Sequence, residues 1–226
     1  RCLSRGLGDV YKRQDIFYSE QFEMINKKIE NQSNDSLFFT RSNLDNSKVD
    51  KIVSDALHKA DDGELFMEFC ESESFVYDDQ RLKSASFDTS KGFGLRAIAG
   101  ESSGYAHSSD IDENALKKAS ETVNFITKDH NANFNANFSK TNRKLYNEIN
   151  PINETEFSEK VETLKKIDEY ARSKNPNVKQ VSASLNGEWQ AVRIYRPGGI
   201  MIEDLRPLVR LYVSIVLEKD GRQENG

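Results

Sequence analysis

The stretch that decides the fold runs from Glu73 to Ser109 and reads ESFVYDDQRLKSASFDTSKGFGLRAIAGESSGYAHSS. Short runs of apolar and small residues alternate in it with three clusters of turn residues, which are Asp78–Gln80, Asp88–Lys91 and Gly100–Gly104. In the last of these runs the apolar side chains fall on one side of an extended chain: Phe93, Leu95, Ala97 and Ala99. A period-two pattern broken by turns about every eight to ten residues predicts an antiparallel β-meander.

Three helices and a strand are predicted around this meander. Apolar residues three and four positions apart indicate helices over 15–31, 45–60 and 111–126. Ser47 with Asp50 predicts a capping box for the second helix, and Asp110 with Glu113 predicts the cap of the third. Alternation over 64–70 predicts a strand that leads into the meander.

The second half of the sequence predicts another α+β unit. An Asn-rich duplication, NANFNANF at 131–138, marks a surface loop within a linker over 129–152. A helix is predicted over 154–172, with Asn153 and Glu156 as cap and Phe157, Val161, Leu164, Ile167 and Tyr170 as its buried residues. Asn186-Gly187 predicts a hairpin turn between strands 178–185 and 189–195, and 209–217 predicts a last strand.

These elements predict an α+β protein. We expect an antiparallel β-meander packed with helices over 15–128, the linker 129–152, and a second helix-plus-β-hairpin α+β subdomain over 153–226. Residues 1–14, RCLSRGLGDVYKRQ, have no usable periodicity and are interpreted as translated adapter or cloning sequence. Asp220-Gly221 predicts a two-residue hairpin turn whose partner strand starts at Arg222, so we expect the sequence to be truncated at this hairpin.

The composition narrows the class of protein. The chain has 226 residues, of which 36% are hydrophobic and 31% charged, and its net charge is −5. The acidic balance argues against a nucleic-acid partner, and no apolar run approaches the roughly 20 residues of a membrane helix. The cysteines, Cys2 and Cys70, lack metal or redox spacing, and no secretory signal is evident, which favours a cytoplasmic location.

The sequence offers no catalytic constellation. His58, His107 and His130 are far apart and none is followed by a glutamate, so no metal ligand is predicted. Gly92-Phe93-Gly94 lacks the remainder of a phosphate loop and favours a bulge or a close approach of strands. The acid pairs Asp61-Asp62 and Asp78-Asp79 are interpreted as solvated turns. We therefore predict no catalytic residue and no metal ligand, and the substrate-binding residues are unknown at this level.

Three segments carry a resemblance to a known family: VYDDQRLKSASFDTSKGFGLRAIAGESSGYAHSSDI (76–111), VKQVSASLNG (178–187) and DLRPLVRLYVSIVLEKDGRQENG (204–226). Together they resemble the N-terminal half of the TldD/PmbA family of zinc metallopeptidases, which are also labelled modulators of DNA gyrase. In that family a His-Glu-x-x-x-His helix and a later cysteine hold the zinc ion, in the C-terminal half. No residue of this sequence matches those positions.

The resemblance implies a cytoplasmic zinc metallopeptidase that cleaves unfolded peptides in an enclosed cavity and pairs with a PmbA-like subunit. This chain would contribute to the cavity wall and the subunit interface, would be inactive alone because it lacks the His-Glu-x-x-x-His motif, and would bind neither nucleic acid nor membrane. Two alternatives stay open: a PmbA-like non-catalytic partner subunit, and a free-standing peptide-binding module.

Overall fold

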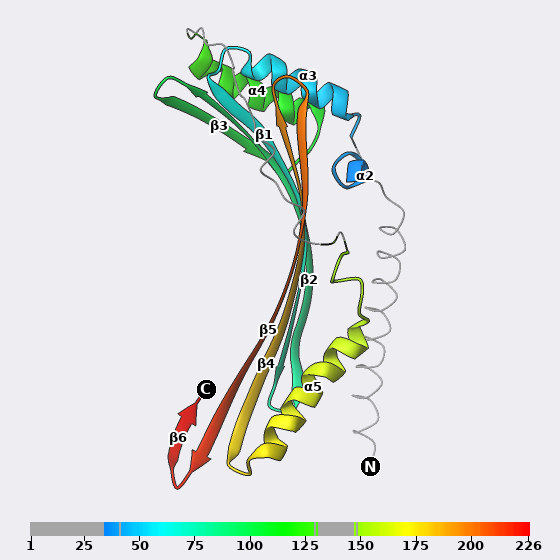
Figure 1. Cartoon of the computed structure of the whole chain (residues 1–226), viewed down its shortest axis with the longest axis vertical. Helices are drawn as coiled ribbons and strands as arrows, with labels where there is room; N and C mark the ends of the chain where they lie inside the picture. The colour runs from blue at the N-terminus through cyan, green and yellow to red at the C-terminus, as the bar shows by residue number, and fades with distance from the viewer. Residues whose placement is uncertain (1–33, 41, 129, 131–146, 148) are drawn as a thin grey trace, which may run out of the picture.

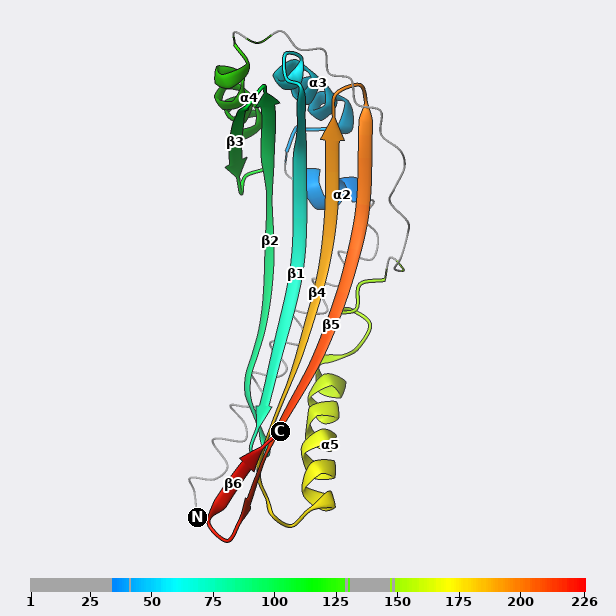
Figure 2. The same ribbon diagram turned by 60° about the vertical axis from the view of Figure 1, so that its left-hand side comes forward.

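The computed structural model describes residues 34–40, 42–128, 130, 147 and 149–226. In this part of the chain six strands form one antiparallel sheet with the spatial order β3-β2-β1-β4-β5-β6. Four of the strands are 17 to 20 residues long, and the sheet that they form is a long, bowed and twisted ribbon (Figures 1 and 2). The strands are β1 (Asp62–Asp78), β2 (Arg81–Ala99), β3 (Ser102–Ser108), β4 (Val178–Arg196), β5 (Ile200–Lys219) and β6 (Arg222–Asn225).

The helices lie on the outer side of the bow, and its inner side carries none of the described helices (Figure 1). Three of them cover one end of the sheet and the fourth covers the other end (Figure 2). They are α2 (Asn34–Phe39), α3 (Asn46–Leu57), α4 (Glu113–Thr127) and α5 (Phe157–Lys174). The predicted α+β class with an antiparallel sheet is confirmed. None of the described helices combines the length and the apolar character that crossing a bilayer requires.

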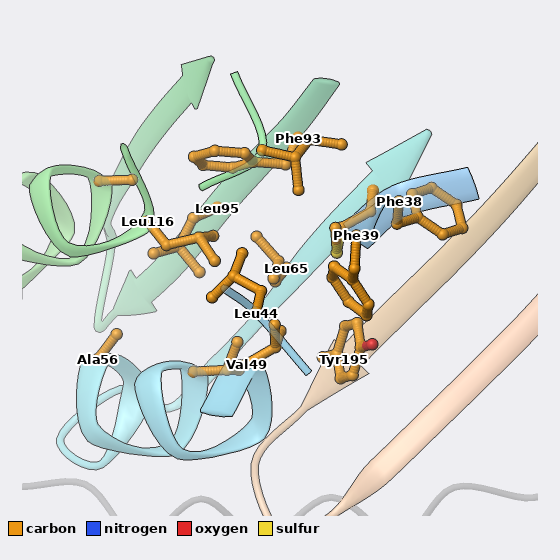
Figure 3. Close-up of a cluster of buried hydrophobic side chains, with 14 of the residues drawn as sticks. Phe38, Phe39, Leu44, Val49, Ala56, Leu65, Phe93, Leu95, Leu116 and Tyr195 are labelled. Atoms are coloured by element: carbon orange, nitrogen blue, oxygen red, sulfur yellow. The ribbon is translucent and has the colours of Figure 1, made fainter. Parts of the chain in front are cut away.

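The period-two pattern of the long strands sorts their side chains between the two faces of the sheet. Along β1 and β4 the odd-numbered positions are mostly the buried ones, and they point toward the helices. Two apolar cores result. The larger, under α2, α3 and α4, includes the residues labelled in Figure 3: Phe38, Phe39, Leu44, Val49, Ala56, Leu65, Phe93, Leu95, Leu116 and Tyr195. The smaller, under α5, consists of Phe75, Tyr77, Leu164 and Ala183, with partly buried side chains packed around it.

Two predicted turns are wrong, because the strands continue through them. Asp88–Lys91 lies inside β2, and Asn186-Gly187 lies inside β4. At the second position the local preference for a turn is overridden by pairing with both neighbouring strands. Ser74 Oγ donates a hydrogen bond to Asn186 Oδ1 at 2.8 Å, so the amide oxygen of Asn186 has a partner within the sheet.

The turns at Asp78–Gln80 and Asp220-Gly221 agree with the sequence, whereas of Gly100–Gly104 only Gly100 and Glu101 form a turn, because β3 begins at Ser102. Asp79 and Gln80 have φ values of 48° and 64°, and they connect β1 to β2 at the predicted turn. Asp220 and Gly221 have φ values of 53° and 78°, which is the arrangement of a type I′ hairpin turn. The partner strand begins at Arg222, as predicted, and pairs with the end of β5.

The helix caps differ from the predictions by a residue or two. Asp45 caps α3 through Lys48 N, in place of Ser47, and Asp112 caps α4 through Ala115 N, in place of Asp110. Both aspartates have extended backbone, which places the carboxylate over the free amides of the first turn. At α5 the cap position is Glu156, but its side chain makes no capping hydrogen bond.

The buried face of α5 is also only partly as predicted. Leu164 is buried, but Tyr170 is 64% exposed. The buried positions include Lys160 and Asp168, so the helix presents charged groups to the sheet. The predicted helix over 15–31 and the Asn-rich duplication lie outside the described residues.

The two predicted units share the sheet. Strands β1, β2 and β3 come from the first unit and β4, β5 and β6 from the second. They meet where β1 pairs with β4 from Leu65 to Asp78, so the backbone hydrogen bonds run across the sheet from one unit to the other.

Candidate functional site

The three histidines occupy separate places. His58 is the C-cap residue of α3, and its Nδ1 atom lies 2.7 Å from the backbone carbonyl oxygen of Asp55 in the same helix. His130 lies 2.8 Å from Asp61 Oδ2, so it is paired and not simply solvated. His107 is exposed on β3, where its ring stacks on Tyr105. Within the described ranges no three His, Cys, Asp or Glu side chains converge on a point where a metal ion would sit.

The glycines of β2 serve close packing, in agreement with the sequence. A Cβ on Gly94 would lie 2.5 Å from the hydroxyl of Tyr105, because the Tyr105 ring covers this glycine. A Cβ on Gly92 would lie 2.8 Å from the carbonyl oxygen of Ser108. No phosphate loop is formed, since both glycines lie in the middle of a strand.

The acid pairs at the ends of β1 are engaged in surface contacts. Asp61 accepts a hydrogen bond from Gly100 N at 2.6 Å, and this bond, with the contact to His130, lowers the pKa of its carboxyl group. Asp79 lies 3.1 Å from Arg172 of α5. Asp78 accepts from Gln180 at 2.8 Å. These contacts join the two ends of β1 to the neighbouring segments of the chain, which is a structural role.

A charged pair is buried between the two apolar cores. Lys160 of α5 donates to both carboxylate oxygens of Glu73 at 2.8 Å and to the carbonyl of Ile152 at 2.7 Å. Both side chains are only 4% exposed. Burial raises the pKa of Glu73, and the hydrogen bonds and charge of Lys160 oppose that rise. The pair locks α5 to β1.

Glu71 lies two residues before Glu73 on the same face of β1. It is 1% exposed and accepts a hydrogen bond from Asn150 Nδ2 at 2.7 Å. Burial raises the pKa of the Glu71 carboxyl, and the bond from Asn150 only partly offsets the rise. Glu71 and Asn150 therefore fasten the segment that precedes α5 onto the sheet.

A second buried cation, Arg193 of β4, joins α2 to the sheet. Its guanidinium donates to Glu203 at 2.8 Å and to Asn46 at 3.0 Å, and it pairs with Asp35 at 2.8 Å. It also lies over the ring of Phe38, 5.1 Å from the ring centroid. Its partners come from three other elements, α2, α3 and β5, which indicates a structural role.

Cys70 is an unreactive thiol on the inner face of the sheet. Burial, and then the nearby carboxylates of Glu188, Glu68 and Asp88, raise its pKa to about 11. A thiol with so high a pKa is protonated at neutral pH and is a poor nucleophile or metal ligand.

The inner face has a hollow of about 370 Å³ at the end where β3, β2 and β1 lie side by side. Its lining includes Phe66 and Glu68 of β1, Gly92 and Gly94 of β2, and Tyr105 and His107 of β3. Gly92 and Gly94 contribute no side chains to its floor, and the ring of Tyr105 lies over Gly94, so the hollow is a trough between an acidic wall on β1 and an aromatic wall on β3. A second hollow of about 460 Å³ lies between β3 and the first turns of α4.

Strand β5 carries most of the exposed apolar surface. Six of its large hydrophobic residues are exposed: Met201, Ile202, Leu208, Val209, Leu211 and Tyr212. β6 pairs only with the end of β5, from Val216 to Lys219, so in the described structure the rest of this edge has no neighbouring strand. An apolar strand edge of this length favours association with another polypeptide.

Neither the buried charged residues nor the trough was predicted from the sequence. A signal for Glu71 and Glu73 existed, since they fall in phase with Leu65, Met67 and Phe75 on the buried side of β1. The trough had no signal of its own, because its residues come from three strands that the register brings together.

Comparison with known proteins identifies two matching domain families and several relatives of this chain. Residues 63–124 match the PmbA/TldA metallopeptidase domain 1, and residues 150–226 match the PmbA/TldA metallopeptidase central domain. A metalloprotease TldD homolog of Haemophilus influenzae is 32% identical over 191 residues, which cover 83% of this chain and 40% of the relative. A metalloprotease TldD homolog of Buchnera aphidicola (Schizaphis graminum) is 28% identical over 189 residues, covering 83% of this chain and 39% of the relative. The chain thus spans about 40% of the length of these curated relatives.

Solved structures show the same fold. A Bacteroides thetaiotaomicron protein described as a candidate modulator of DNA gyrase superposes with a TM-score of 0.63 at 15% identity, over 79% of this chain and 43% of that one. A Thermotoga maritima protein with the same description gives a TM-score of 0.53 at 14% identity, over 73% and 38% of the two chains. By its two domain matches and its curated relatives, the chain belongs to the PmbA/TldD metallopeptidase family.

Proposed function

We propose that this chain is the non-catalytic N-terminal region of a TldD-like zinc metallopeptidase that degrades or processes unfolded peptides in the cytoplasm. The observation that carries the proposal is the paired match to domain 1 and the central domain of this family, together with relatives named metalloprotease TldD. Because the chain spans about 40% of those relatives, the zinc-binding and catalytic residues are assigned to the remainder of the enzyme.

The residues of the described structure do not fit a zinc site. His58, His107 and His130 lie on different elements, and no carboxylate or thiol completes a set of three ligands with any of them. A zinc ion that activates water needs three protein ligands around one open position. No catalytic step is therefore assigned to these residues.

The inner face of the sheet supports a role as a wall of the substrate cavity. It bows around a space that the described helices leave open (Figure 1). The inner face of its central strands carries several small hydroxyl side chains, which can donate and accept hydrogen bonds: Ser72, Ser74, Ser84, Ser86, Ser182 and Ser184. Such a surface can accept a peptide backbone without selecting bulky side chains.

Strand β5 supports a role in the subunit interface. Leu208 and Tyr212 point to the inner face and Val209 and Leu211 to the outer face, and all four are more than half exposed. A partner that covers this edge would bury both sides of the strand. We assign it to a PmbA-like subunit, and replacing Leu211 and Tyr212 by serine is expected to weaken copurification with that subunit.

The experiment that tests the function is a domain exchange. The matched 191 residues of the Haemophilus influenzae relative are replaced by those of this chain. The exchanged enzyme, mixed with a PmbA-like subunit, is expected to bind about one zinc per chain and to cleave a reduced, carboxymethylated polypeptide until a chelator is added. The 226-residue chain alone is expected to bind no stoichiometric zinc and to leave the polypeptide intact.

Two results would contradict the proposal. One is metal-dependent cleavage by the 226-residue chain alone. The other is an exchanged enzyme that folds and binds zinc but does not cleave, while the unmodified relative does. The second result would favour the alternative of a PmbA-like non-catalytic subunit, which the names of the relatives speak against.

A further inference from the structure

The trough on the inner face has the dimensions of a side-chain binding site. Opposed residues in neighbouring strands share a face, so the pairings Phe66–Gly94–His107 and Glu68–Gly92 place these groups together on the side away from the core. Since neighbouring strands are about 4.8 Å apart, the backbones of β1 and β3 are separated by about 10 Å, and the ring of Tyr105 reaches from β3 into this space over Gly94. The volume of about 370 Å³ is in the lower range for ligand sites.

The acidic wall carries a carboxylate that the fold does not use. Glu68 forms no ion pair or side-chain hydrogen bond with the residues that the structure describes, although it lines the trough. Glu64, four residues earlier on the same face, is paired with Arg96 at 3.3 Å and with Arg196 at 3.0 Å. The contrast shows that the sheet neutralises one acid of this face and leaves the next one available.

The opposite wall is aromatic. Tyr105 is 63% exposed and its ring stacks on His107, with ring centroids 5.7 Å apart. The ring of Tyr105 packs directly over Gly94, in space that any side chain at position 94 would occupy. This contact positions the ring. An exposed, positioned ring opposite a free carboxylate is the arrangement that attracts a cation.

We propose that this trough binds the cationic side chain of an extended peptide, with arginine preferred. The guanidinium would form charge-assisted hydrogen bonds to Glu68 and stack on Tyr105, which its flat shape permits and an ammonium group does not. The peptide character of the ligand rests on the proposed function, whereas the charge preference rests on the trough itself.

The carboxylates around the trough favour a positively charged ligand. Burial is the main cause of the raised pKa of Cys70, and the carboxylates of Glu188, Glu68 and Asp88 on the inner face raise it further. Lys91 also lines the hollow, although its register partner is Phe69, on the face opposite to that of Glu68, and the positive charge of Lys91 opposes the binding of a cation. Neutralising Lys91 is therefore expected to strengthen cation binding.

The test compares two peptides that differ in one charge. A fluorescent seven-residue peptide with a central arginine, and the same peptide with neutral citrulline, are titrated against the full chain in EDTA, and anisotropy is measured. Arginine is expected to bind roughly tenfold or more tightly than citrulline, the effect of a hydrogen bond to a charged group. Glu68→Gln is expected to remove this difference, and Tyr105→Ala to weaken arginine binding about 2- to 5-fold.

Glu121→Gln on the exposed surface of α4 is the matched control, because it removes the same charge on the opposite side of the sheet from the trough and is expected to change nothing. Lys91→Gln is expected to tighten binding of the arginine peptide. Equal affinity for the two peptides, no binding at millimolar concentration, or a normal arginine preference in a folded Glu68→Gln variant would overturn the proposal. None of these measurements needs zinc or cleavage, so such a failure leaves the domain-exchange result untouched.

Discussion

Replacing Lys160 by methionine tests how strongly the fold depends on the buried pair of Lys160 and Glu73. Methionine keeps most of the apolar volume, but Glu73 is left buried without its cation and without the two 2.8 Å hydrogen bonds. Removing one partner of a buried pair costs about 3–5 kcal/mol, because the remaining charge is not solvated. We expect Lys160→Met to lower the free energy of unfolding by about that amount at pH 7.5, measured by urea denaturation.

The loss is expected to depend on pH, with a sign that follows from the pKa of Glu73. Burial already raises this pKa above the unfolded value of 4.5, and the variant lacks the lysine that opposes the rise. A carboxyl group with a raised pKa binds its proton more tightly in the folded state, so its stability contribution falls as the pH rises above the unfolded pKa. The deficit of Lys160→Met is therefore expected to be smallest near pH 4 and to grow toward neutral pH.

The double variant Glu73→Gln with Lys160→Met is the control. It removes both charges, so it is expected to recover much of the loss at pH 7.5 and to abolish the added pH dependence. The reasoning would be refuted by a single variant that loses less than about 1 kcal/mol, or by a loss that stays constant between pH 4 and pH 7.5.

Three further substitutions probe single contacts. Gly187→Ala places a Cβ 2.9 Å from Glu73 Oε1, and the forced shift of that carboxylate is expected to cost about 1–3 kcal/mol in thermal unfolding; an unchanged melting temperature would contradict this. Arg193→Met is expected to cost about 2–3 kcal/mol, less than a fully buried pair, because its partner Glu203 is exposed enough to be solvated; faster hydrogen exchange in α2 would report the lost contact. Asp112→Ala is expected to cost about 1 kcal/mol through the lost cap of α4, and Asp112→Asn should restore most of it.

Much of the candidate site was beyond prediction from the sequence. The trough could not be predicted, because Glu68, Gly92 and His107 are brought together by the registers of two strand pairs and not by any local pattern. The pairing of Glu73 with Lys160 likewise joins residues 87 positions apart.

The sequence by itself determined the elements whose signals are local. The apolar stripes of α3 and α4, the alternation in β1 and the Asp220-Gly221 turn depend on contacts within a few residues or on backbone conformations that particular residues favour. The tertiary structure alone decided how far β2 and β4 extend, which strand β1 meets, and which charges are buried. The physical reason is that a local preference for a turn is small compared with the cross-strand hydrogen bonds and side-chain contacts that a continuous strand gains on both sides, and those depend on residues far away in the chain.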